Sequence, residues 1–162
     1  MVTQIFADER LAVFCGDEPD TRDHVPPNVF LDKPYPDNLL IVGACDKCNS
    51  GASLDEQFIA CLLEVVTCGT AAPAGLRRPN IVRTLTRAPA LSEQLARGLR
   101  SSGGFLMGAE DIKRLARVLE KVGRALWAYQ TGEPTRGVSA SVSWSAKDTG
   151  GFSSGTRARR GL

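Results

Sequence analysis

Apolar and polar residues form short mixed runs in the first third of the chain and recur at helical spacing further on. Two apolar runs, residues 11–14 and 38–42, are typical of strands. Prolines between them exclude a continuous helix, because proline lacks the N–H that a helix interior needs. These are Pro19, Pro26, Pro27, Pro34 and Pro36.

From Ser53 onward the spacing becomes helical. Ser53 is a candidate N-cap with Glu56 three residues later, and a helix is predicted over residues 54–67. A short helix is predicted over 91–99 and a long one over 109–130. The apolar stripe of the long helix consists of Ile112, Leu115, Val118, Leu119, Val122, Leu126 and Tyr129.

The order of these elements predicts an α+β fold in which a small strand-containing module precedes a mainly helical part. A loop of small residues and proline over 69–75 separates the two. The predicted domains are therefore 1–68, a helical part 69–146 with a possible strand at 138–144, and a flexible basic tail 147–162 rich in glycine, serine and arginine.

Length and hydropathy restrict the class of protein. A chain of 162 residues with 43% apolar residues suits one globular unit or one small module with an appended bundle. No apolar run approaches the roughly 20 residues needed to span a bilayer, and the first ten residues do not have the pattern of a signal peptide. We therefore expect a cytoplasmic protein without a membrane partner.

The small net charge of +2 conceals a strong asymmetry. Residues 1–60 carry 4 basic and 11 acidic side chains, whereas residues 61–162 carry 16 basic and 7 acidic ones. Carboxylates in the first part can recruit a divalent metal, and a polyanion would be attracted by the second part.

Cysteine and histidine are the residues with the most chemical information. Five cysteines in a cytoplasmic chain favour metal binding or burial over disulfides, and one histidine excludes a histidine-rich metal site within one chain. The Cys45-x-x-Cys48 pair alone is compatible with half of a zinc knuckle, with a redox pair or with coincidence.

Four short motifs follow one another within 38 residues. They are Phe14-Cys15-Gly16, Asp23-His24-Val25-Pro26-Pro27, Asn38, and Cys45-Asp46-Lys47-Cys48-Asn49. This order resembles the HNH endonuclease family over about residues 10–60, and residues 112–134 are similar to a C-terminal helix of some stand-alone bacterial members. The resemblance implies a ββα-metal core, with the helix near Ser53 completing it.

The resemblance also implies roles for four residues. His24 would be the general base for hydrolysis of a DNA phosphodiester, while Asp23 and Asn49 would provide oxygens for Mg²⁺ or Mn²⁺. Asn38 would hold the loop between the strands, although a turn residue is equally consistent with its position after Pro36. DNA would be the partner of such an enzyme.

A structural Zn²⁺ is implied as well, with one departure from the family pattern. Members of this type hold zinc with two Cys-x-x-Cys pairs, but Ala12 stands where the first cysteine is expected, which leaves Cys15, Cys45 and Cys48. The fourth ligand is then another side chain or water, or the metal has been lost. The candidate side chains for the fourth ligand are Asp8, Asp17, Cys61 and Cys68. Cys61 and Cys68 are also interpreted as small buried residues that bind no metal.

Two other functions remain compatible with the sequence. The scaffold can serve as a non-catalytic zinc-knuckle module that binds nucleic acid or protein, or as a metal-dependent enzyme for a small-molecule substrate. Both alternatives arise because few basic residues surround the motif, namely Arg10, Arg22, Lys33 and Lys47, whereas affinity for nucleic acid depends on phosphate contacts.

Overall fold

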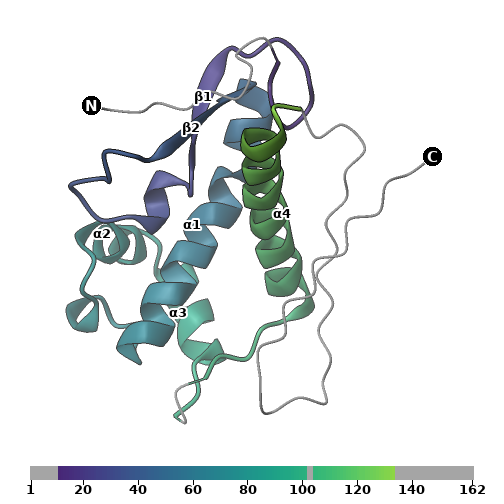
Figure 1. Ribbon diagram of the computed structural model, residues 1–162. Helices are drawn as coiled ribbons and strands as arrows, with labels where there is room; N and C mark the ends of the chain where they lie inside the picture. Colours follow the sequence, from purple (N-terminus) through teal and green to yellow (C-terminus); the bar gives the residue numbers. More distant parts are fainter. Residues whose placement is uncertain (1–10, 102–103, 134–162) are drawn as a thin grey trace. The chain divides into compact units, whose positions relative to one another are not determined.

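The computed structural model describes residues 11–101 and 104–133. Within them the chain is α+β: two antiparallel strands, four α-helices and two short 3-10 helices (Figure 1). The elements follow in the order β1 (Thr21–Val25), η1 (Asn28–Phe30), β2 (Leu40–Ala44), α1 (Asp46–Cys68), η2 (Pro73–Gly75), α2 (Pro79–Arg87), α3 (Pro89–Gly98) and α4 (Ala109–Thr131).

These elements form two compact units built from interleaved segments. Unit 1 combines residues 11–26, 36–51 and 116–133, and unit 2 combines residues 27–35 and 52–115, with the gap at 102–103. Helices α1 and α4 therefore contribute residues to both units. The predicted division into domains 1–68, 69–146 and 147–162 stays a prediction.

Unit 1 is centred on the β1–β2 pair. The register places Asp23 opposite Val42 and His24 opposite Ile41. Its core joins the hairpin to the C-terminal part of α4, which lies beside the strands in Figure 1. The buried members are Val13, Val25, Val42, Ala125 and Ala128, with Phe14, Leu40 and Val122 packed against them.

Unit 2 is helical. Pro79 and Pro89 begin α2 and α3, where the missing N–H of proline costs nothing because the first turn of a helix has no acceptor for it. Large side chains from the three helices are almost inaccessible to solvent. They are Phe58, Ile59, Leu62 and Val65 of α1, Ile81 and Leu85 of α2, and Leu95 of α3.

The bounds of the long C-terminal helix and of the short one before it were predicted well. The predicted apolar stripe of the long helix is mostly exposed, however: Ile112, Leu119, Leu126 and Tyr129 face solvent, and the buried face contains Val118, Lys121, Ala125 and Ala128.

Helix α1 was predicted too short. It begins at Asp46 rather than residue 54. The carbonyl of Cys45 accepts hydrogen bonds from the N–H groups of Cys48 and Asn49, and Asp20 accepts one from the N–H of Asp46 at 2.7 Å. These contacts begin the helix before Ser53, whose expected capping role was therefore wrong.

The first predicted strand was wrong. Residues 11–14 are not a strand, and a turn spans residues 13–15, although Val13 donates its N–H to the carbonyl of Gly43 at 3.0 Å. The strand is instead Thr21–Val25, and β2 lies two residues later than predicted. An aspartate occupies an inward position of β1, so the alternation of apolar residues that identifies a strand is missing there.

Helix α2 was not predicted, and the predicted strand 138–144 and tail 147–162 lie outside the described residues. None of the described helices is long and apolar enough to cross a membrane.

Candidate functional site

Strand β1 places the side chain of Asp23 in the interior of unit 1. Successive side chains of a strand point to opposite faces, and Asp23 and Val25 are the buried members of β1. The Oδ2 atom of Asp23 lies 2.7 Å from Nζ of Lys121, and both side chains are only 9% exposed. Asp23 is therefore half of a buried ion pair formed with α4.

Asn49, in the first turn of α1, completes this cluster. Its Nδ2 atom donates to the carbonyl of Arg22 at 3.3 Å, and its Oδ1 atom accepts a long hydrogen bond from Lys121 at 3.5 Å. The ammonium also lies 5.5 Å from the centre of the Phe14 ring, which suits a cation–π contact. One cationic group thus touches oxygens from both β1 and α1.

Sequence reasoning did not include Lys121 in the site. The available signal was its place on α4: Val118, Ala125 and Ala128 form the buried face of the helix, and Lys121 is the one charged residue among the buried residues of this element. A buried lysine needs a partner, because its charge loses hydration. The acidic first part of the chain provides that partner.

His24 lies on the other face of β1 from Asp23. It is half-buried and shares its face with the exposed Arg22, two residues earlier. Asn38 is exposed in the turn at residues 37–38 before β2. The structure thus brings Asp23 and Asn49 together at Lys121. His24 is next to Asp23 in β1 but faces the other side of the strand, and Asn38 lies in a turn outside the paired residues of β1 and β2.

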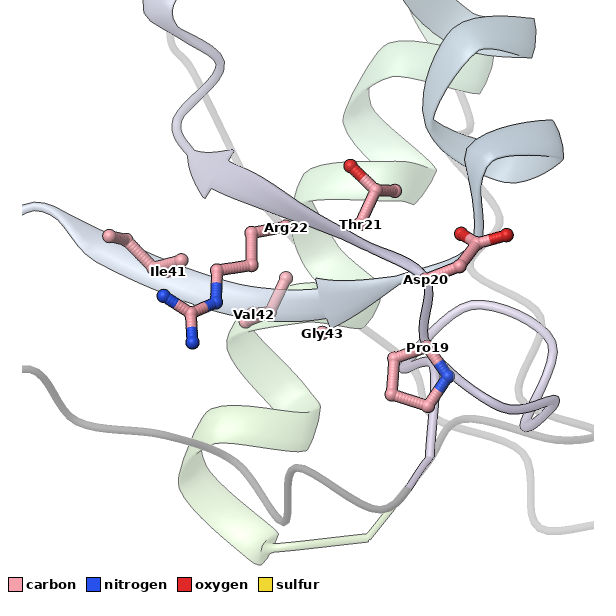
Figure 2. A pocket seen from close by; sticks show the side chains of 7 residues that line it. All are labelled: Pro19, Asp20, Thr21, Arg22, Ile41, Val42 and Gly43. Carbon is pink, nitrogen blue, oxygen red and sulfur yellow. The ribbon is translucent and has the colours of Figure 1, made fainter.

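A surface hollow of about 250 Å³ follows the hairpin on the side of Arg22. Figure 2 shows the Arg22 side chain extending from β1 across β2, with its guanidinium alongside Ile41. Since Ile41 is the register partner of His24, the hollow begins next to the histidine position. Its remaining lining residues are Pro19, Asp20, Thr21, Val42 and Gly43.

Cys15, Cys45 and Cys48 form a second cluster in unit 1. Their sulfur atoms all lie within 4.8 Å of one another, and Sγ of Cys15 is 3.5 Å from Sγ of Cys45. Cys15 is presented by a turn in which Gly16 has a φ of 74°, a value that glycine adopts without strain. Cys45 immediately precedes α1, and Cys48 lies in its first turn. Such a group could hold a metal ion.

Local hydrogen bonds give the three thiols different proton affinities. The backbone N–H of Cys48, followed by the thiols of Cys48 and Cys15, lowers the pKa of Cys45. Burial, followed by hydrogen bonds with the other two thiols, raises the pKa of Cys48 to about 12. A backbone hydrogen bond from Asp17 lowers the pKa of Cys15, but burial and side-chain hydrogen bonds outweigh it, and the net shift is upward. Three thiolates together therefore require the charge of a bound cation.

The position at which the family pattern has a further cysteine is Ala12, in the interior of unit 1. Ala12 is fully buried, and its N–H donates to the carbonyl of Asp17 at 2.8 Å. Asp17 hydrogen bonds to Cys15. Cys61 is fully buried, as predicted, and Cys68 donates to Glu64 at 3.4 Å; both belong to unit 2. Asp8 lies outside the described residues.

The donor atoms of the two clusters suit different metals. Three thiolates form a soft site that fits Zn²⁺. The carboxylate oxygen of Asp23 and the amide oxygen of Asn49 are hard donors, the type that Mg²⁺ and Mn²⁺ bind, and in this structure both contact the ammonium of Lys121.

Comparisons of the chain with protein-family models, with curated proteins and with solved structures found no match.

Proposed function

We propose that this protein is an HNH-type, divalent-metal-dependent endonuclease that hydrolyses DNA phosphodiester bonds. One observation carries the proposal: Asp23 of β1 and Asn49 of α1 direct oxygen atoms at a single cationic group, Nζ of Lys121, at 2.7 and 3.5 Å. These are the two residues that the motif assigns to the metal. They are 26 positions apart in the chain, and their convergence on one cation supports the assignment.

Each of the chain's own residues has a definite task in this proposal. His24 accepts a proton from the attacking water, a role that the ring nitrogen of a neutral imidazole can fill. Asp23 and Asn49 hold Mg²⁺ or Mn²⁺. The bound metal would stabilise negative charge on the phosphate and on the leaving oxygen.

Arg22 supports a phosphate position at the edge of β1. Its guanidinium shares the face of His24 and borders the hollow, and arginine forms paired hydrogen bonds with phosphate oxygens. A DNA backbone held there would place a phosphate beside the imidazole of His24, on the same face of β1 as Arg22. We propose Zn²⁺ at the three cysteines, where it would fasten the turn of Cys15 to the start of α1.

Nicking of supercoiled plasmid tests the proposal. We expect cleavage with Mg²⁺ or Mn²⁺, loss of cleavage on chelation, and a rate about 10²–10⁴-fold lower in His24→Ala, since that is the usual contribution of a general base. Thr86→Ala, an exposed position of α2 outside the cluster, is the matched control and should cleave normally.

Cleavage that survives both His24→Ala and chelation would reject the nuclease. Metal analysis of the purified protein separates the alternatives further. About one zinc per chain without cleavage under any divalent metal would favour the non-catalytic zinc-binding module.

A further inference from the structure

Lys121 differs from an ordinary surface lysine on the same helix. Its side chain is 9% exposed and its ammonium contacts Asp23, Asn49 and the ring of Phe14. Lys113, also on α4, has a side chain that is 67% exposed and pairs with Glu110 one turn away. A flexible lysine side chain is confined in this way only where its surroundings provide acceptors for the charge.

The ammonium of Lys121 and a divalent ion need the same oxygen atoms. A metal held by Asp23 and Asn49 would bind to the oxygens that now accept hydrogen bonds from Nζ of Lys121. Two positive groups a few ångströms apart repel strongly in a buried site. Because the carboxylate is on a strand and the amide on a helix, the lysine side chain is the part that can move.

We propose that the ammonium of Lys121 competes with the divalent metal for the oxygens of Asp23 and Asn49, so that the metal binds only when the ammonium moves away. This inference rests on the proposed function, since it concerns the same site. The ion pair keeps the buried carboxylate neutralised in the absence of metal. Its cost is a weaker affinity for the metal.

Titration with Mn²⁺, followed by the electron paramagnetic resonance of the free ion, tests the competition directly. We expect Lys121→Met to bind Mn²⁺ about tenfold or more tightly than the parent chain, because a neutral side chain removes the repulsion. Lys113→Met, the exposed control, should bind as the parent does. Asp23→Ala measures any Mn²⁺ held elsewhere, including by the thiols.

A second measurement covers the case in which Lys121→Met folds poorly without metal. Its melting temperature should then rise with Mn²⁺ more steeply than that of the parent chain, because a ligand that binds the folded state stabilises it. A purely structural lysine predicts the opposite: weaker Mn²⁺ binding, or none, once it is removed.

The outcomes separate this inference from the nuclease proposal. Unchanged or weaker Mn²⁺ binding by Lys121→Met would reject the competition even if the parent chain cleaves plasmid. Tighter binding in Lys121→Met would support the competition even if no variant cleaves DNA, and only the nuclease would then fail.

Discussion

Each unit of the molecule buries carboxylates, and one from each unit, Glu64 in unit 2 and Asp23 in unit 1, can be compared because the two are held in different ways. In unit 2, Glu64 accepts hydrogen bonds from the backbone N–H groups of Arg77 and Arg78, at 2.7 and 3.0 Å, and from the Cys68 thiol. In unit 1, Asp23 is paired with the ammonium of Lys121, which reaches it from another part of the chain.

The difference lies in what the donors can do. Backbone N–H groups at the start of α2 cannot leave without unfolding the segment, so Glu64 is a permanent part of the structure. A lysine side chain has four rotatable bonds and can withdraw while the fold persists. Immobile backbone donors, such as those around Glu64, suit a purely structural carboxylate. A mobile ammonium, such as that of Lys121, suits a carboxylate that exchanges one cation for another.

The largest expected effect comes from removing the mobile partner. Lys121→Met should lower the free energy of unfolding by about 3–5 kcal/mol in buffer without added metal, because the Asp23 carboxylate remains buried without its ammonium. The double variant Asp23→Asn, Lys121→Met should recover to within about 1.5 kcal/mol of the parent chain, since no uncompensated charge remains. Urea unfolding followed by circular dichroism measures both. A double variant as unstable as Lys121→Met would show that the loss is one of packing rather than charge.

Removing the Glu64 carboxylate should lower the free energy of unfolding somewhat less than Lys121→Met does. No second substitution can compensate for it, because the donors left without an acceptor belong to the backbone. Glu64→Leu leaves two backbone N–H groups without their acceptor, and the expected loss is about 3 kcal/mol of unfolding free energy. Glu93→Leu, an exposed position of α3, is the matched control and should change stability by no more than about 0.5 kcal/mol. Equal effects of the two substitutions would contradict the structural role of Glu64.

Local patterns were sufficient to predict α3 and α4, because apolar residues recur there at the helical period. The motif order also predicted that Cys15, Cys45 and Cys48 belong together, and their sulfur atoms do form one group. These successes depend on residues whose type and spacing carry the signal themselves.

The missed features depend on partners distant in the chain. Strand β1 escaped prediction because its inward residue Asp23 is charged, and that charge is tolerated only through Lys121, nearly a hundred positions later. Lys121 is one of five lysines in the chain, and nothing in its immediate sequence distinguishes it from an exposed one. A buried ion pair gives no local sequence pattern when its two members are on different elements.

The smallest expected effect is the pH dependence of stability that comes from the Glu64 carboxylate. Burial on its own raises the pKa of Glu64, but the hydrogen bonds from the N–H groups of Arg77 and Arg78 outweigh it, and the pKa is lowered from its ordinary value of 4.5. The unfolded chain therefore binds a proton at a higher pH than the folded one. The stability that this carboxylate contributes is fully present above the unfolded pKa and is lost as pH falls through the folded pKa.

Urea unfolding between about pH 6 and pH 3 checks this sign through the linkage between proton binding and stability. Glu64→Gln cannot titrate, so its stability should fall less steeply than that of the parent chain at the acid end, and the gap between the two curves should narrow there. Glu93→Gln, at the exposed position of α3, should follow the parent chain more closely. Parallel curves for Glu64→Gln and the parent across the whole range would show that the pKa of Glu64 is the same in both states, and the backbone donors would then provide no preference for the charged form.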